Sequence, residues 1–253
     1  MRLTERDKIN LLYALRQDIR VEPLFVAETG SHAWGTSTPE SDHDFTVIAQ
    51  DVHYDIFSYP RDSFTAKIKL ETTECDVRIF SPVKFLRKLQ KSVLVGYEAV
   101  FSPLVYHGND STRELLKSVA EHCFDPREMY RSVIGGLKSV NAEDPGKRRR
   151  QQFRYMFTAL QLRDMLEHGR LPKVCVKEYI LTDIRADNFY PWIARLYDWA
   201  TSIELSEKEQ AFAEMTLQGL YDFDYPSVRQ FKLTEHRDFL NEKFAKLVEV
   251  NNL

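Results

Sequence analysis

Two aspartates separated by a single residue are the most distinctive chemical pattern in the sequence. Asp42 and Asp44 stand at the start of an apolar run typical of a strand. Side chains alternate along an extended chain, so these two project to one side while His43 points to the other. Neighbouring carboxylates repel each other unless a cation compensates them. Mg²⁺ prefers oxygen ligands and often takes a few carboxylates together with substrate phosphates, so the pair indicates a magnesium site.

A glycine and a serine precede the aspartate pair. Gly30 lets the backbone approach a phosphate closely, and the hydroxyl group of Ser31 and the amides that follow are donors for anionic oxygens. The turn residues up to Ser41 would bring the aspartate strand back beside this glycine. We therefore expect Gly30, Ser31 and Ser41 to contribute to binding the phosphates of a nucleotide.

A third acid is expected on a neighbouring strand. Asp76 lies between Cys75 and Val77, which is typical of an inward-facing acid on an otherwise buried strand. The alternative is a structural ion pair with Arg78 or Lys67. An aspartate pair alone is common in solvated turns, but its combination with the glycine turn and the third acid favours a functional site.

Together these residues resemble the signature of the DNA polymerase β-type nucleotidyltransferase superfamily, which is a Gly-Ser turn, an Asp-x-Asp strand and a later single acid. The segment 30–48, GSHAWGTSTPESDHDFTVI, more narrowly resembles the RNA-repair-associated predicted nucleotidyltransferases of bacteria and phages. In this family an acidic strand follows, then a helix with a Lys-Phe-Leu core and then a glutamate. Their counterparts here are 75–77, Lys84-Phe85-Leu86 and Glu98. A Leu-x-x-Gly-x-Leu-Pro-like turn has its counterpart at 166–172.

The resemblance implies transfer of a nucleoside monophosphate from an NTP such as ATP to a hydroxyl acceptor, with release of pyrophosphate. It implies that Asp42, Asp44 and Asp76 hold two Mg²⁺ ions, or Mn²⁺ in their place, and that Asp76 accepts the hydroxyl proton. Lys84 and Arg148 join the expected nucleotide-binding residues. The acceptor could be an RNA end, a protein hydroxyl or a small molecule, and the family's association with RNA repair favours RNA.

Other readings of these residues stay open at this point. The segment 147–150, Lys-Arg-Arg-Arg, is either a solvated helix start or a site for a triphosphate or RNA backbone. His32 and His43 lack the usual zinc spacing, and His32 either faces the nucleotide or packs in a loop. Lys84 and Glu98 could be ordinary residues of a surface helix. The whole chain could be a catalytically silent nucleotide- or RNA-binding protein, or an antitoxin-like enzyme that modifies another protein.

The elements that position these residues change in character along the chain. Up to residue 108, short strands are expected at 24–28, 45–49, 66–71 and 75–80, with a first helix capped by Thr4 whose apolar face is Ile9, Leu12, Leu15 and Ile19. Later segments have helical periods: 112–122, 126–142, 148–168, 188–201, 206–220 and 234–250. We predict an α+β fold, with a polymerase β-like nucleotidyltransferase domain built on a mixed sheet at 1–108 and an α-helical domain at 109–253.

Composition limits the class of protein. Hydrophobic residues make up 43% and charged residues 29% of the 253 residues, which is ordinary for a globular protein. No apolar run approaches the ~20 residues of a membrane span, and the N-terminus lacks the apolar core of a signal peptide, so we expect a cytoplasmic protein. The net charge of -3 means that any contact with nucleic acid needs a local basic patch. The three cysteines lie far apart, which argues against a disulfide framework.

Overall fold

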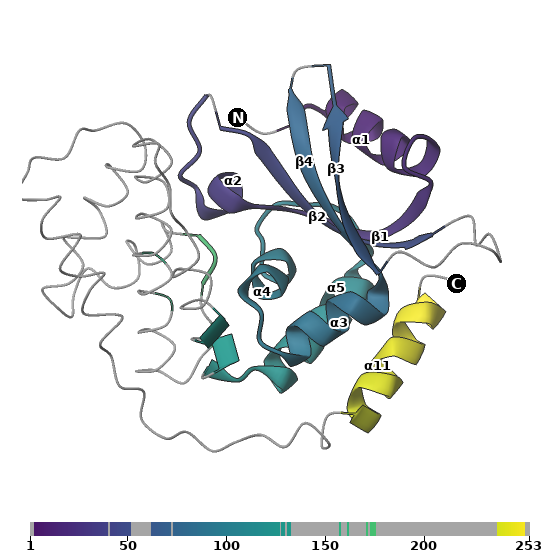
Figure 1. Ribbon diagram of the computed structural model, residues 1–253, viewed down its shortest axis with the longest axis vertical. Coiled ribbons are helices and arrows are strands. Elements are labelled where there is room, and N and C mark those ends of the chain that lie inside the picture. The colour runs from purple at the N-terminus through teal and green to yellow at the C-terminus, as the bar shows by residue number, and fades with distance from the viewer. Residues whose placement is uncertain are drawn as a thin grey trace, which may run out of the picture.

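The computed structural model describes residues 3–39, 41–51, 62–71, 73–126, 128–129, 131–132, 157, 161, 171, 173–175 and 237–250. The elements are α1 (Glu5–Gln17), β1 (Val21–Thr29), α2 (Gly30–Trp34), β2 (His43–Asp51), β3 (Ser63–Lys69), β4 (Glu74–Phe80), α3 (Pro82–Gln90), α4 (Leu94–Val100), β5 (Val105–His107), α5 (Asp110–Cys123) and α11 (Arg237–Val250). Figure 1 shows helices on both sides of one twisted sheet.

The sheet has five strands in the order β3-β4-β2-β1-β5. β1 is antiparallel to β2 and to β5, β2 is parallel to β4, and β3 with β4 forms an antiparallel pair. The prediction of an α+β fold with a mixed sheet is therefore confirmed, and so are the four predicted strands. β1 and β2 are longer than expected because their polar ends also pair with neighbouring strands.

One face of the sheet is covered by α1. Thr4 caps this helix as predicted, because its Oγ1 accepts a hydrogen bond from the backbone amide of Asp7 at 3.1 Å. Leu11 and Leu15 are fully buried against apolar side chains of the sheet. The predicted apolar face was wrong at Ile9, which is 66% exposed. The helix turns Leu11 and Leu15 toward the sheet, and this rotation leaves Ile9 on the outer side.

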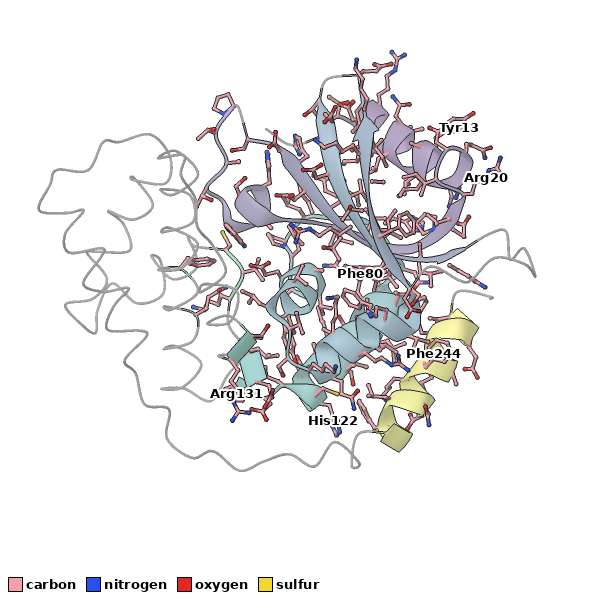
Figure 2. All side chains as sticks on the ribbon, in the orientation of Figure 1. Tyr13, Arg20, Phe80, His122, Arg131 and Phe244 are labelled. Carbon is pink, nitrogen blue, oxygen red and sulfur yellow. The ribbon has the colours of Figure 1, made fainter. Side chains whose placement is uncertain are left out.

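The opposite face is covered by α3, α4 and α5. Ser81 caps α3, and Pro82 occupies the first turn of this helix. Phe80 and Phe85 belong to the core on this face, and the aromatic ring of Phe244 on α11 packs against the same core. Figure 2 shows Phe80 where the sheet meets α3, and Phe244 on the side of α11 that faces α3 and α5.

The helices after residue 109 are described only in part. α5 and α11 confirm the helices predicted at 112–122 and 234–250. Both pack on the core that also covers the sheet, and the domain division at residue 108 stays a prediction. The segments 148–168, 188–201 and 206–220 fall almost wholly outside the described residues, as does most of 126–142. Within the described part of the chain, no helix is long and apolar enough to cross a membrane.

Candidate active site

The strand register brings two of the predicted acids together. Asp44, the second residue of β2, pairs with Thr29 at the end of β1 on one side and with Asp76 on β4 on the other. Neighbouring strands lie about 4.8 Å apart and paired residues face the same side, so the Asp44 and Asp76 carboxylates are neighbours. Both residues are half-buried, and Asp42, which directly precedes β2, is exposed. The acids thus lie at one end of the sheet and are accessible to a ligand.

Gly30 lies directly against this acid pair. Its φ of +69° is in the left-handed region that favours glycine. A Cβ atom added at this position would lie 2.6 Å from Oδ2 of Asp44, a separation that real Cβ atoms do not show. The glycine is therefore required both by its backbone conformation and by the close approach of the carboxylate.

Ser31 and Ser41 shape the turn between β1 and β2. The carbonyl oxygen of Ser31 accepts a hydrogen bond from the Thr36 amide at 2.8 Å. Oγ of Ser41 accepts one from the Thr38 amide at 2.8 Å, and the Ser41 amide donates to the Thr38 carbonyl at 3.1 Å. Ser41 thus closes the turn that returns the chain to β2. Ser31 follows Gly30 in α2 and lies at the same end of the sheet as the acids.

Lys67 is the cation nearest to Asp76 among the described side chains. Its Nζ lies 2.9 Å from Oε1 of Glu74 and 3.6 Å from Oδ1 of Asp76. The hydrogen bond with Glu74 and the charge of Asp76 raise the pKa of Lys67. The ion pair considered from the sequence is therefore present. Because the Lys67 side chain is 69% exposed, water screens this pair, and the ammonium group can leave Asp76 at little cost.

One predicted nucleotide-binding residue, Lys84, is not brought to the acids. Lys84 lies in the first turn of α3, which follows the C-terminal end of β4, whereas Asp76 is near the N-terminal end of that strand. With a rise of about 3.3 Å per residue, the end of the strand at Phe80 is roughly 13 Å from Asp76. Arg148 and the rest of the cluster 147–150 lie outside the described residues.

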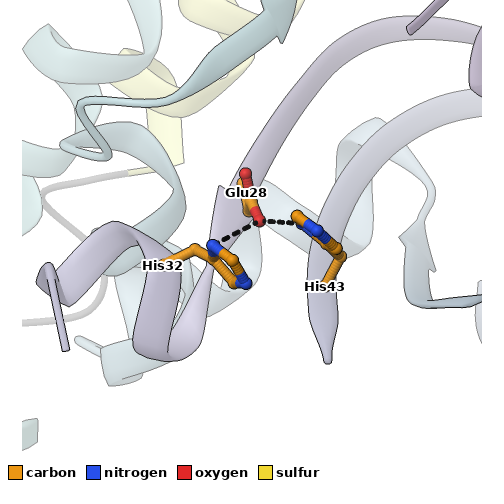
Figure 3. Close-up of side chains that lie close together, drawn as sticks. All are labelled: Glu28, His32 and His43. Carbon is orange, nitrogen blue, oxygen red and sulfur yellow. Dashed lines mark hydrogen bonds and ion pairs between the residues drawn. The ribbon is translucent and has the colours of Figure 1, made fainter. Parts of the chain in front are cut away.

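The other face of the sheet carries a buried polar cluster that the sequence reasoning missed. Glu28 is completely buried, and its Oε1 lies 2.6 Å from Nδ1 of His43 and 3.7 Å from Nδ1 of His32. The hydroxyl group of Tyr106 donates a hydrogen bond to the second carboxylate oxygen at 2.6 Å. Figure 3 shows Glu28 between the two histidine rings. An acid within the apolar run of β1 was the signal that could have revealed this cluster.

The geometry of this cluster is that of hydrogen bonding. The ligand atoms of Glu28, His32 and His43 lie within 4.8 Å of one another, as in a metal site. However, two ligands of a tetrahedral zinc ion are separated by roughly 3.3 Å, more than the 2.6 Å between Glu28 and His43. The histidine rings are also stacked, with centroids 4.1 Å apart, so their in-plane lone pairs do not converge. His32 has a packing role, and burial lowers its pKa.

A second buried contact holds α2 from the opposite side. The indole Nε1–H of Trp34 donates a hydrogen bond to Oε1 of Glu98 at 3.1 Å. Glu98 is only 4% exposed, so the alternative that it is an ordinary residue of a surface helix does not hold. Ser102 adds a hydrogen bond from its hydroxyl to the Glu28 carbonyl at 2.6 Å. These contacts, together with the histidine cluster, fix the segment that carries Gly30 next to the acids.

The donor set at the acids selects a particular kind of ligand. Asp42, Asp44 and Asp76 provide only carboxylate oxygens, which fit a hard divalent cation such as Mg²⁺ better than a softer metal. The buried histidines face the other side of the sheet and do not add nitrogen ligands. The fold and the site together define an α+β protein of the nucleotidyltransferase-like class.

Comparison with known proteins agrees with this class. Residues 5–216 match the RNA repair pathway DNA polymerase beta family (RlaP), and the chain belongs to this family. No curated protein matches the chain. Among solved structures, the crystal structure of a nucleotidyltransferase-like protein from Exiguobacterium sibiricum is similar over 98% of this chain and 91% of that chain, with 14% identity and a TM-score of 0.36. That similarity is too distant to assign individual residues.

Proposed function

We propose that the protein is a magnesium-dependent nucleotidyltransferase that moves a nucleoside monophosphate from an NTP to a hydroxyl group at an RNA end. One observation carries this proposal. Asp44 and Asp76 are paired across parallel strands, and the missing side chain of Gly30 leaves room for the Asp44 carboxylate. The backbone of the glycine turn and two acids thus meet at one point. Membership of an RNA repair pathway family supports RNA as the acceptor.

Each residue has a distinct role in this proposal. Asp42 and Asp44 would hold Mg²⁺, which when bound neutralises charge on the reacting phosphate groups. The backbone at Gly30 and the hydroxyl group of Ser31 would bind the outgoing phosphates. Asp76, on the side of Asp44 away from Gly30, would accept the proton of the attacking hydroxyl at a carboxylate oxygen. The chain positions the attacking oxygen opposite the leaving pyrophosphate.

A second candidate is a nucleotide- and RNA-binding protein without transferase activity. The position of Lys67 favours it, because an ammonium group 3.6 Å from Asp76 already offsets part of the negative charge that a metal ion would compensate. The two candidates differ in the turnover that they predict for both the wild type and Lys67→Gln. A transferase with an exposed, displaceable lysine keeps its turnover, and a silent binding protein shows no turnover with or without the lysine.

The deciding experiment uses the purified full chain with Mg²⁺, each α-labelled NTP in turn, and a synthetic RNA with a free hydroxyl end. Labelled RNA is expected with the wild type, and Asp44→Asn should remove this activity while the protein stays folded by circular dichroism. Asp18→Asn is a matched control, because it removes one carboxylate from the exposed end of α1. Full activity of Asp44→Asn would refute the assignment. NTP binding without labelled product under any condition would favour the silent protein.

A further inference from the structure

Four basic side chains follow Asp76 along β4 and α3, on the face of the sheet that carries the acids. Arg78 has the parity of Asp76 on β4 and is exposed two residues further along, roughly 7 Å away. Lys84 and Lys88 follow on α3, and Lys91 is its C-terminal cap. We call these four residues the basic track. Along α3 it extends over seven residues, about 10 Å.

Lys88 lies close enough to the other three cations of the basic track to be repelled by them. The ammonium group of Lys88 lies over the ring of Phe80, 4.9 Å from its centroid, where β4 passes into α3. The pKa of Lys88 is lowered, mainly by burial and to a smaller extent by the positive charges of Lys84, Arg78 and Lys91. The ring of Phe80 offsets this repulsion only in part, through a cation–π contact. A negatively charged ligand would relieve it more fully.

Within the described part of the chain, no residue of the basic track forms an ion pair with a carboxylate. Other lysines of this fold do form ion pairs: Lys8 pairs with Glu5, and Lys117 pairs with Glu114 at 2.9 Å. The whole chain is acidic, with a net charge of -3, so a general excess of lysine and arginine does not explain the cluster. Local positive charge without counter-charges is the usual footprint of a surface that contacts nucleic acid.

The strand order indicates which substrate could contact the basic track. Gly30 follows β1, on one side of Asp44, whereas β4 with Asp76 lies on the other side. The phosphates of an NTP at the glycine turn are thus separated from the basic track by the acids. A compact triphosphate also does not need cations spread over β4 and two turns of α3. An extended polyanion fits this arrangement, with its end at Asp76.

We infer that the basic track binds the phosphate backbone of a single-stranded RNA acceptor and leads its end to Asp76. The acceptor role rests on the proposed function, but binding of RNA to this surface does not require turnover. Lys84, expected from the sequence to contact the nucleotide, would on this view contact the acceptor strand instead.

The test measures binding of a short, fluorescently labelled single-stranded RNA to the full chain by anisotropy, without Mg²⁺ or NTP. Arg78→Gln combined with Lys88→Gln should raise the Kd about tenfold or more. Each lost phosphate contact lowers the slope of log K against log salt by roughly 0.7, so this pair should lower it by roughly 1.4. Lys84→Gln with Lys91→Gln is a second pair that leaves the contact with Phe80 intact. Lys8→Gln with Lys117→Gln removes the same charge elsewhere and should change neither value.

Three results would overturn the inference. The first is unchanged RNA affinity and salt slope in both track variants, or no RNA binding by the wild type at low salt. The second is a loss of Mg²⁺–NTP affinity in the track variants with RNA affinity retained, which would make the surface a triphosphate site. The third is equally tight binding of an acidic peptide, which would indicate a protein partner. RNA binding that depends on the track in a protein without transferase activity would refute the proposed function and leave the binding surface standing.

Discussion

Replacement of Gly30 by alanine tests the link between the glycine turn and the acid pair. The new Cβ atom would lie 2.6 Å from Oδ2 of Asp44, whereas ordinary contacts begin near 3.4 Å. The carboxylate or the turn must therefore move by the difference, roughly 0.8 Å. Gly35→Ala is a matched control. Its φ of +77° is equally unfavourable for alanine, but the nearest atom to its Cβ is Sγ of Cys175, at 3.3 Å.

The two substitutions share one energetic cost and differ in the other. Left-handed backbone costs alanine about 1–2 kcal/mol, so both variants should lose about this much stability. Only Gly30→Ala also displaces the carboxylate of Asp44, which is catalytic in the proposed function. A misplacement of about 1 Å at a reacting centre can lower a rate by about 100-fold, and we expect a loss of this order for Gly30→Ala alone.

The two effects are separated by measuring urea unfolding and transferase rate on the same preparations. Rates are compared at a temperature where both variants are folded, so that stability does not enter. Gly35→Ala should keep most of its rate. If Gly30→Ala turned over NTP as fast as Gly35→Ala, the carboxylate would not need the space that the glycine leaves, and the reasoning on the site would be wrong.

Three further predictions concern the rest of the described fold. Glu28→Gln should lower the free energy of unfolding, measured with urea, by about 2 kcal/mol, because the amide nitrogen cannot accept one of the buried hydrogen bonds that the two carboxylate oxygens make. An unchanged urea midpoint would contradict a structural role for the histidine cluster. Burial lowers the pKa of His107, so the folded state binds fewer protons than the unfolded state and stability should fall as the pH drops below about 6.5. His107→Gln should make this fall shallower in unfolding curves at a series of pH values. In the native protein a thiol reagent should modify the half-exposed Cys175 well before Cys75 and Cys123. Burial raises the pKa of Cys75 to about 12 and that of Cys123 to about 11, so these two thiols resist the loss of a proton that the reaction needs. All three cysteines should react in denaturant.

Much of the fold follows from local pattern. Short apolar segments predicted the strands that became β2 and β4, and Thr4 predicted the start of α1. Ile9 shows where such reasoning fails. Several rotations of α1 would bury an apolar stripe, and only the shape of the sheet beneath it selects Leu11 and Leu15 over Ile9.

Burial of single polar residues was harder to predict. Glutamate is usually found at the protein surface. Glu98 is buried where its carboxylate accepts a hydrogen bond from the indole of Trp34, 64 residues earlier in the chain. Glu28 depends in the same way on Tyr106, 78 residues later. A buried carboxylate is stable only where donors converge on it, and such partners are defined by packing between distant segments.

The residues of the proposed acid centre could be recognised from local sequence. The spacing of Asp42 and Asp44, the glycine at position 30 and a lone acid at position 76 are local features, and alternation along a strand decides the side to which each points. Which of these residues are neighbours depends on how the strands pair in the folded chain. Strand order places Asp44 between the glycine turn and Asp76. Pairing across strands depends on contacts between distant segments, which no local pattern encodes.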